Sequence, residues 1–147
     1  MEEESSGTIV AAFRKNTREM ICVGKSEFQG KHLVFVRTYI PGDHTKELVP
    51  TPSGVSLAAE LTRELIEGVR ALKDYLTTEG VAAKIKKNSK QEVWIGMSIF
   101  KEMPLIYIRT YATWGDDPEF KPTKKGISVS TDLYSQLLDT VQQLNEG

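Results

Sequence analysis

Hydrophobic and polar residues alternate along three stretches in the second half of the chain, as expected for β-strands that bury one face. In the middle stretch, Ile106 and Ile108 fall on one side of an extended chain, whereas Tyr107 and Arg109 fall on the other. The segment from residue 112 to residue 126 is rich in turn-forming residues and is expected to be a loop. The three predicted strands are EVWIGMSIF, LIYIRTY and GISVS, at residues 92–100, 105–111 and 126–130.

A helical spacing replaces the alternation after residue 130 and predicts a helix. Ser130 or Thr131 can cap this helix, and Asp132 lies in its first turn, where a carboxylate is favourable. The apolar positions of the helix are Leu133, Leu137, Leu138, Val141 and Leu144. An equivalent stripe in the first half comprises Leu61, Leu65, Ile66, Val69 and Leu72.

The two halves are copies of one another at an offset of 72 residues. Residues 13–72 align with residues 85–144 without any insertion, and 18 of the 60 pairs are identical. Typical composition would give only about three or four identities by chance. The string VRTY at residues 36–39 returns as IRTY at residues 108–111. We conclude that one structural unit has been duplicated.

Sequential strands that lead into a helix predict an α+β fold. We expect two tandem units, each with an antiparallel sheet and a helix against one face. The first unit is expected at residues 8–76 and the second at residues 84–147, with residues 77–83 as a linker. Such a short linker keeps the units in contact. Residues 1–7 are expected to be disordered because they are terminal and polar.

Composition narrows the class of protein. The chain has 147 residues, of which 39% are hydrophobic and 27% charged, as in ordinary globular proteins. No apolar run approaches the roughly 18 residues of a membrane span, and the acidic start differs from a secretory signal, so we expect a soluble, cytoplasmic protein. Cys22, His32 and His44 do not recur between the halves, which argues against metal sites, cofactors and enzymatic activity.

The sheet face opposite the helix is expected to carry aromatic rings and arginines in both units. Such groups stack on unpaired bases at roughly 1–3 kcal/mol per base, whatever the base, and cations neutralise the phosphates. Because a duplex buries its base faces, this pattern favours a single-stranded ligand. The residues of this face are Phe35, Arg37 and Tyr39 in the first unit and Tyr107, Arg109 and Tyr111 in the second.

The distribution of charge along the second unit also favours a nucleic-acid ligand. Residues 77–130 carry nine basic and six acidic groups, a net +3. The helix that follows has three acidic residues and no basic one, a net −3. The basic residues concentrate in KIKKNSK, residues 84–90, and KPTKK, residues 121–125, on either side of the strands. A phosphate backbone could follow these clusters.

Each feature taken alone has a simpler interpretation. An alternation of Tyr, Arg and Tyr is more often a half-exposed sheet face, and lysines in turns are usually only solvated. Tryptophans are more often buried in a core, although Trp114 lies in a loop rich in Gly, Asp and Pro and is harder to bury than Trp94. The recurrence of the helix stripe together with the arginine-bearing face favours binding.

The string FKEMPLIYIRTYATWGDDPEFKPTKKGISVSTDLYSQL, residues 100–137, resembles the single-stranded-DNA-binding domain of the positive cofactor 4 family of transcriptional coactivators. The resemblance implies a strongly curved, four-stranded antiparallel sheet followed by one helix. It also implies that two such units pair through their helices and bind single-stranded or melted DNA across both sheets. With both units in one chain, we expect a monomer that acts as an intramolecular pseudo-dimer.

The resemblance also implies site residues, namely Phe100, Arg109, Trp114, Lys124 and Lys125, with Trp114 displaced by two positions from the family pattern. The first unit has Gly42, Val49, Pro52 and Ser53 where the second has Trp114, Lys121, Lys124 and Lys125, so we expect the second unit to bind more strongly. The full predicted site is Phe28, Lys31, Phe35, Arg37, Tyr39, Lys86, Lys87, Phe100, Lys101, Tyr107, Arg109, Tyr111, Trp114, Lys121, Lys124 and Lys125.

The sequence therefore predicts a protein that captures single-stranded DNA with little sequence preference, in transcription regulation or DNA maintenance. It would act in the bacterial nucleoid or the eukaryotic nucleus. Two alternatives stay open: RNA as the ligand, and a scaffold that contacts the transcription machinery through a sheet edge or loop. Further self-association of pseudo-dimers is also open.

Overall fold

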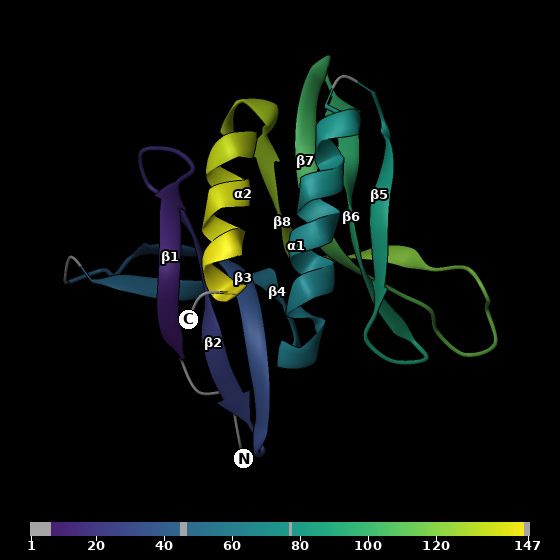
Figure 1. Cartoon of the computed structure of the whole chain (residues 1–147), viewed down its shortest axis with the longest axis horizontal. Coiled ribbons are helices and arrows are strands. Elements are labelled where there is room, and N and C mark those ends of the chain that lie inside the picture. Colours follow the sequence, from purple (N-terminus) through teal and green to yellow (C-terminus); the bar gives the residue numbers. More distant parts are fainter. Residues whose placement is uncertain (1–6, 45–46, 77, 146–147) are drawn as a thin grey trace.

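Two four-stranded antiparallel sheets form the molecule, each with its strands in chain order (Figure 1). The computed structural model describes residues 7–44, 47–76 and 78–145. The first sheet contains β1 (Thr8–Arg14), β2 (Met20–Phe28), β3 (Lys31–Pro41) and β4 (Leu48–Ala58). The second sheet contains β5 (Gly80–Lys86), β6 (Gln91–Phe100), β7 (Met103–Ala112) and β8 (Lys121–Ser130).

A helix follows each sheet, so the predicted α+β fold with two tandem units is confirmed. Each helix begins and ends in a 3₁₀ turn. Ser130, one of the two expected caps, accepts a hydrogen bond at its Oγ from the backbone N–H of Asp132 at 3.2 Å. The helical elements are η1 (Ala59–Leu61), α1 (Thr62–Ala71) and η2 (Leu72–Asp74), then η3 (Thr131–Leu133), α2 (Tyr134–Gln142) and η4 (Gln143–Asn145).

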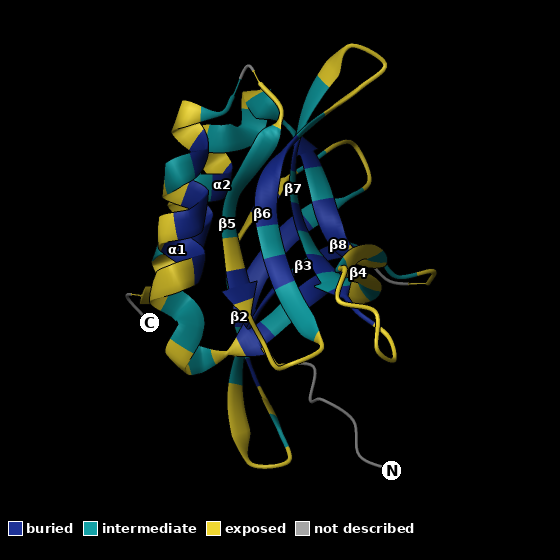
Figure 2. Ribbon diagram, turned by 90° about the vertical axis from the view of Figure 1, so that its right-hand side faces the viewer, coloured by how far each residue is buried: buried dark blue, intermediate teal, exposed yellow. Residues whose placement is uncertain are grey.

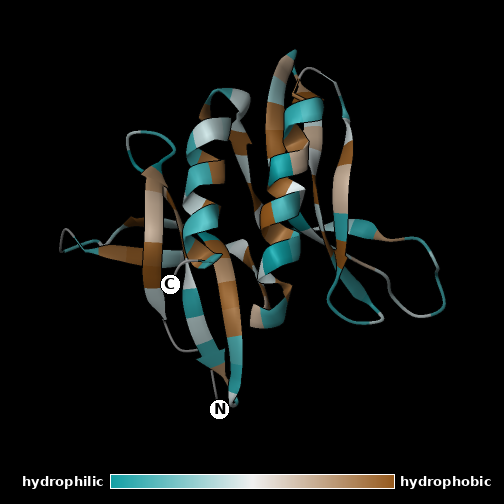
Figure 3. Cartoon of the chain, viewed as in Figure 1, coloured by the Kyte–Doolittle hydropathy of each residue, from teal (hydrophilic) through white to brown (hydrophobic). Residues whose placement is uncertain are grey.

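The main core lies between a layer of helices and the two sheets (Figure 2). The alternating strands bury the predicted faces, since Val93, Ile95 and Met97 are at most 2% exposed. Both helices turn their apolar stripes inward and their polar residues outward (Figure 3). Each fully buried Leu or Ile contributes about 1.5–3 kcal/mol, so this shared core stabilises both units together.

Each helix packs mainly on the sheet of the other unit. Helix α1 contacts β5, α2 contacts β1 and β2, and the two helices contact each other (Figure 1). The hydroxyl of Tyr134 donates a hydrogen bond to the carbonyl oxygen of Val69 at 2.9 Å, which links α2 to α1. At the other side of the pseudo-dimer, β4 contacts β8. The two units therefore share one core.

Two sequence-based boundaries are wrong. Strand β5 begins at Gly80, inside the stretch expected to be a linker, because Gly80 and Val81 pair with β6 ahead of an irregularity in the register. Strand β8 begins at Lys121 rather than at Gly126, so the basic segment expected in a loop is part of the sheet. Of the expected disordered stretch, residues 1–6 lie outside the described residues.

Within the part of the chain that the structure describes, each helix is too short or too polar to span a lipid bilayer.

Candidate nucleic-acid interface

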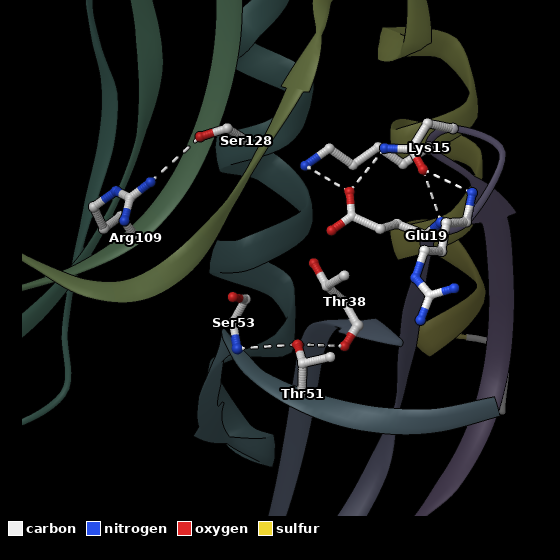
Figure 4. Close-up of polar contacts among 9 residues, drawn as sticks. Lys15, Glu19, Thr38, Thr51, Ser53, Arg109 and Ser128 are labelled. Atoms are coloured by element: carbon white, nitrogen blue, oxygen red, sulfur yellow. Dashed lines mark hydrogen bonds and ion pairs between the residues drawn. The ribbon is translucent and has the colours of Figure 1, made fainter. Parts of the chain in front are cut away.

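One arginine on the outer face of each sheet, the face away from the helices, is fixed by the same pair of hydrogen bonds. Arg109 donates from Nη1 to the carbonyl oxygen of Thr123 at 3.1 Å. It also donates from Nη2 to Oγ of Ser128 at 3.3 Å (Figure 4). Arg37 makes both bonds with the residues 72 positions earlier, at 3.1 and 3.4 Å. Both guanidinium groups are therefore held in place on half-buried side chains.

A bulge in the neighbouring strand supplies these acceptors. Arg109 pairs with Gly126 and Tyr111 with Pro122, so residues four apart on β8 face residues two apart on β7. Within the bulge, the hydroxyl of Thr123 donates to a β7 carbonyl at 2.8 Å. Figure 4 shows the equivalent contacts of the first unit, among Thr38, Thr51 and Ser53. The bulge places exposed Lys124 and Lys125 close to Arg109 in the sheet.

Three rings form a continuous row across the outer face of the second sheet, which we call the aromatic row: Trp94, Tyr111 and Tyr107. Trp94 and Tyr111 are stacked with ring centroids 3.8 Å apart, and Tyr107 follows with its centroid 6.5 Å from that of Tyr111. Lys84 Nζ lies 4.2 Å from the centroid of the Trp94 ring. The indole N–H donates to Glu92 Oε1 at 2.8 Å. Contacts with Tyr111, Lys84 and Glu92 therefore hold the indole of Trp94 in place at one end of the aromatic row.

Tyr107 lies flat on the sheet because its cross-strand partner is Gly96. A Cβ atom at Gly96 would approach the Tyr107 hydroxyl to 2.6 Å, so only glycine leaves room for the ring. Burial, reinforced by the neighbouring Tyr111, raises the pKa of Tyr107 to about 12, although the cation of Arg109 opposes this shift. The phenol is thus neutral and half-buried.

Among the Phe, Tyr and Trp residues that the structure describes, Phe100 and Trp114 are the most exposed, at 60% and 61%. Phe100 ends β6 next to the tight β6–β7 turn, and Lys101 Nζ lies 5.4 Å from its ring centroid. Trp114 follows β7, in a loop that Lys90 holds through a hydrogen bond from Nζ to the carbonyl oxygen of Gly115 at 2.8 Å. The expectation that Trp114 resists burial is confirmed.

The predicted lysines are exposed. Lys121 Nζ lies 3.6 Å from Asp117 Oδ2. Because this ion pair is exposed, a phosphate could replace the Asp117 carboxylate as the partner of Lys121 at little cost in free energy. The exposed members of the predicted set are Lys31, Lys86, Lys87, Lys101, Lys121, Lys124 and Lys125.

The first sheet differs on its outer face. Phe35 and Tyr39 are only 3% and 4% exposed, and they form a small second core with Cys22. The prediction that these two rings offer stacking surfaces is therefore wrong. The physical reason is that Cys22 replaces the large Trp94, so the rings pack on their own sheet, 6.2 Å apart. Burial also raises the pKa of the Cys22 thiol to about 11. Phe28 is half-buried.

Trp94 and Lys84 lie beside the predicted residues of the second sheet but were absent from the predicted set. The signal was present, because Trp94 alternates with the buried Val93 and Ile95 and so must lie on the outer face. It is also the direct cross-strand partner of Arg109. Trp94 was left out of the predicted set because tryptophans are more often buried in a core.

Among the described residues, no group of three or more His, Cys, Asp or Glu side chains could hold a metal ion. The arrangement offers instead flat rings, a fixed guanidinium and exposed ammonium groups, which are suited to binding bases and phosphates.

Comparison with known proteins supports the family resemblance. Residues 87–140 match the model of the family described as transcriptional coactivator p15 (PC4). The resemblance is thereby confirmed for the second unit, and the tandem arrangement rests on the repeat and the two sheets. Comparison with curated proteins gave no match.

Two crystal forms of a PC4 homolog from Burkholderia pseudomallei K96243 are similar to part of the chain. The tetragonal form is 20% identical with a TM-score of 0.42, covering 46% of this chain and 98% of that one. The orthorhombic form is 23% identical with a TM-score of 0.43, covering 47% of this chain and 93% of that one.

Proposed function

We propose, on the premise that the second unit matches the PC4 coactivator family, that this chain binds single-stranded nucleic acid, foremost DNA, with little sequence preference. One observation carries the proposal. The outer face of the second sheet combines the aromatic row, the fixed Arg109 and the exposed rings of Phe100 and Trp114. No described residue covers the rings of Phe100 and Trp114 enough to bury them.

Unpaired bases would stack on Phe100 and Trp114, while the aromatic row provides a rigid surface between them. Arg109 adds a planar cation that cannot rotate away, because two hydrogen bonds fix it. Lys124 and Lys125, on the bulge, would neutralise phosphates. Because these contacts address ring faces and phosphates rather than base edges, they distinguish bases weakly.

The two sheets are expected to contribute unequally. The first sheet buries Phe35 and Tyr39, so its contribution would come from Arg37, Phe28 and Lys31. One chain supplies both sheets, and the binding unit is therefore a monomer built as a pseudo-dimer. Transcription regulation or DNA maintenance, in the compartment that holds the DNA, is the process we propose.

Titration of fluorescent oligonucleotides tests this function. We expect tight binding to single-stranded DNA and weaker binding to the matching duplex. Raising the salt from about 50 to 200 mM should weaken binding strongly, because phosphate contacts release counterions. Arg109→Ala should weaken binding at both salt concentrations. Absence of binding to every single-stranded probe would exclude the proposal, and preference for RNA over DNA would reassign the ligand.

A protein-interaction scaffold is the second candidate, favoured by the apolar tip of the β6–β7 hairpin. Ile99, Phe100 and Met103 are 44%, 60% and 58% exposed, which is unusual for apolar residues so close together. Pull-down from nuclease-treated lysate separates the two functions. A partner that survives nuclease and is lost with Met103→Ser would favour the scaffold.

A further inference from the structure

Trp114 lies in the loop between β7 and β8, two residues beyond the end of β7 at Ala112. The loop continues to Lys121, where β8 begins. The ring is 61% exposed, so packing against the core does not set its direction. A ring that moves freely must be ordered when a base stacks on it, and this ordering reduces affinity. Contacts that fix the loop beforehand would therefore strengthen binding.

The turn between β5 and β6 lies beside this loop and is bonded to it on both sides of Trp114 (Figure 1). The backbone N–H of Thr113 donates to the carbonyl oxygen of Lys90 at 3.0 Å. The ammonium group of Lys90 donates to the carbonyl oxygen of Gly115 at 2.8 Å. Lys90 therefore holds the residue before Trp114 and the residue after it, and we call this pair of hydrogen bonds the Lys90 clamp.

Both partners of the Lys90 clamp are fixed by further contacts. In the turn, the backbone N–H of Lys90 donates to Oδ1 of Asn88 at 2.8 Å. In the loop, Gly115 has a φ of 62°, a left-handed conformation that glycine adopts without strain. The N–H of Asp117 donates to the carbonyl oxygen of Trp114 at 3.2 Å, which closes the loop just after the ring. The clamp thus joins two ordered segments of backbone.

The first unit keeps the turn but not the clamp. In its turn, the N–H of Arg18 donates to Oδ1 of Asn16 at 2.9 Å, the same bond as in the second unit. Where the second unit has Thr113, the first has Pro41, which has no N–H, so the first bond of the clamp cannot form there. The next residue, Gly42, carries no ring. The clamp therefore accompanies the exposed ring and is not needed to form the turn.

We infer that Lys90 is a positioning residue for Trp114, which orders the loop in advance so that the indole ring can stack on an unpaired base. This inference rests on the proposed function and assigns a role to a residue outside the predicted site. Lys90 acts through the ring and not through a phosphate, because its ammonium group is bonded to the carbonyl oxygen of Gly115. A direct contact between Lys90 and a phosphate is the alternative that the test distinguishes.

A double-mutant cycle between Lys90 and Trp114 tests the inference. Lys90→Met removes the ammonium group, and single-stranded DNA should then bind about twofold to tenfold more weakly, because the ring must be ordered on binding. In a chain that already carries Trp114→Ala, the same change should have almost no effect, since no ring is left to position. The slope of log affinity against log salt should stay the same, whereas the loss of a phosphate contact would reduce it by about one in both backgrounds.

Two further variants serve as controls. Lys73→Met removes the same charge from the exposed side of η2, in the layer of helices, and should bind like the natural protein. Lys90→Arg retains a donor in the turn, where the first unit has Arg18, and should recover most of the affinity. Because Lys90 is exposed, the melting temperature of each variant should stay close to that of the natural protein.

The fluorescence of Trp114 provides a measurement that does not depend on binding. Trp94→Phe leaves Trp114 as the only tryptophan of the chain, and time-resolved anisotropy then reports the motion of its ring on the nanosecond timescale. Without any oligonucleotide, Lys90→Met should increase the fast loss of anisotropy, and Lys90→Arg should not.

The possible results separate the inference from the proposed function. If the natural protein binds a single strand, but Lys90→Met weakens binding equally with and without the ring of Trp114, the inference is wrong and the function stands. The same conclusion follows if Lys90→Met leaves either the affinity or the motion of the ring unchanged. If the natural protein binds no single strand, the function fails and the inference fails with it.

Discussion

The indole ring of Trp94 and the phenol ring of Tyr111 lie face to face, with their centroids 3.8 Å apart and their planes within 8° of parallel. They lie on neighbouring strands and meet diagonally, because Trp94 pairs with Arg109 and Tyr111 pairs with Glu92. Lys84 lies over the indole as well. Trp94 is therefore a support that fixes Tyr111, rather than a stacking surface for a base.

Replacing Trp94 by leucine should weaken binding of single-stranded DNA. A stacked aromatic pair contributes about 0.5–1.5 kcal/mol beyond its burial, so the loss of order at Tyr111 should cost about twofold to tenfold in affinity. Trp94→Phe keeps a ring against Tyr111 and should retain most of the affinity. Oligonucleotide anisotropy, with circular dichroism to confirm folding, measures both. Equal losses for Leu and Phe would show that the stack does not matter.

Phe100→Ala should weaken binding far more than it affects stability. The ring is 60% exposed, so its removal leaves the core intact, whereas a lost base stack costs roughly 1–3 kcal/mol, or about fivefold to 150-fold in affinity. The melting temperature should stay close to that of the natural protein. Phe28→Ala is the matched variant at the same position of the first hairpin and should lose less affinity, because Phe28 is half-buried. A larger loss from Phe28→Ala would contradict the unequal roles of the two sheets.

Alkaline conditions should destabilise the protein through Tyr107. Its pKa is raised to about 12 in the folded protein, chiefly by burial, whereas an unfolded tyrosine titrates near 10. Between these values the folded state holds a proton that the unfolded state has lost, so stability is constant below about pH 10 and falls as the pH rises towards 12. Urea unfolding at several pH values measures this. Tyr107→Phe should lose less stability over that interval, and parallel losses in the two proteins would exclude Tyr107 as the cause.

The element order, the buried faces and the duplicated arginine strand could all be predicted from the sequence, because they depend on local periodicity and on an ungapped repeat. Ile106 and Ile108, for example, are fully buried on the face that the alternation assigned to them. The packing of each helix on the sheet of the other unit could not be predicted from the sequence. Periodicity identifies the apolar stripe of α1, but it does not say that β5 of the other unit covers it.

The errors at the site have a common physical cause. Position in the repeat predicted that Phe35 and Tyr39 would resemble Tyr107 and Tyr111, yet their exposure depends on the neighbouring strand. Cys22 stands where the second unit has Trp94, and this one change lets the rings of the first sheet close on themselves. Alternation along a strand assigns a face, whereas accessibility depends on cross-strand neighbours.

Glu102→Gly should stabilise the protein. Lys101 and Glu102 form the two-residue turn between β6 and β7 with φ values of 52° and 68°, a left-handed conformation that costs an ordinary residue about 1–2 kcal/mol. The first unit has Gly30 at the equivalent position, with φ of 81°. Glycine also increases the conformational entropy of the unfolded chain, which offsets part of this stabilisation. The free energy of unfolding is therefore expected to rise by about 0.5–1 kcal/mol. This corresponds to a melting temperature about 1–4 °C higher.

The reciprocal variant Gly30→Glu should lower the melting temperature by a similar amount, because it places a side chain in the same backbone conformation. Nothing within 4 Å would meet a Cβ atom at Gly30, so the loss would come from the backbone alone. Differential scanning calorimetry of the two variants tests the argument. Shifts of the same sign in both would mean that the turn conformation does not control stability. Binding should survive Glu102→Gly, since the variant removes a carboxylate beside Lys101 and leaves Phe100 in place.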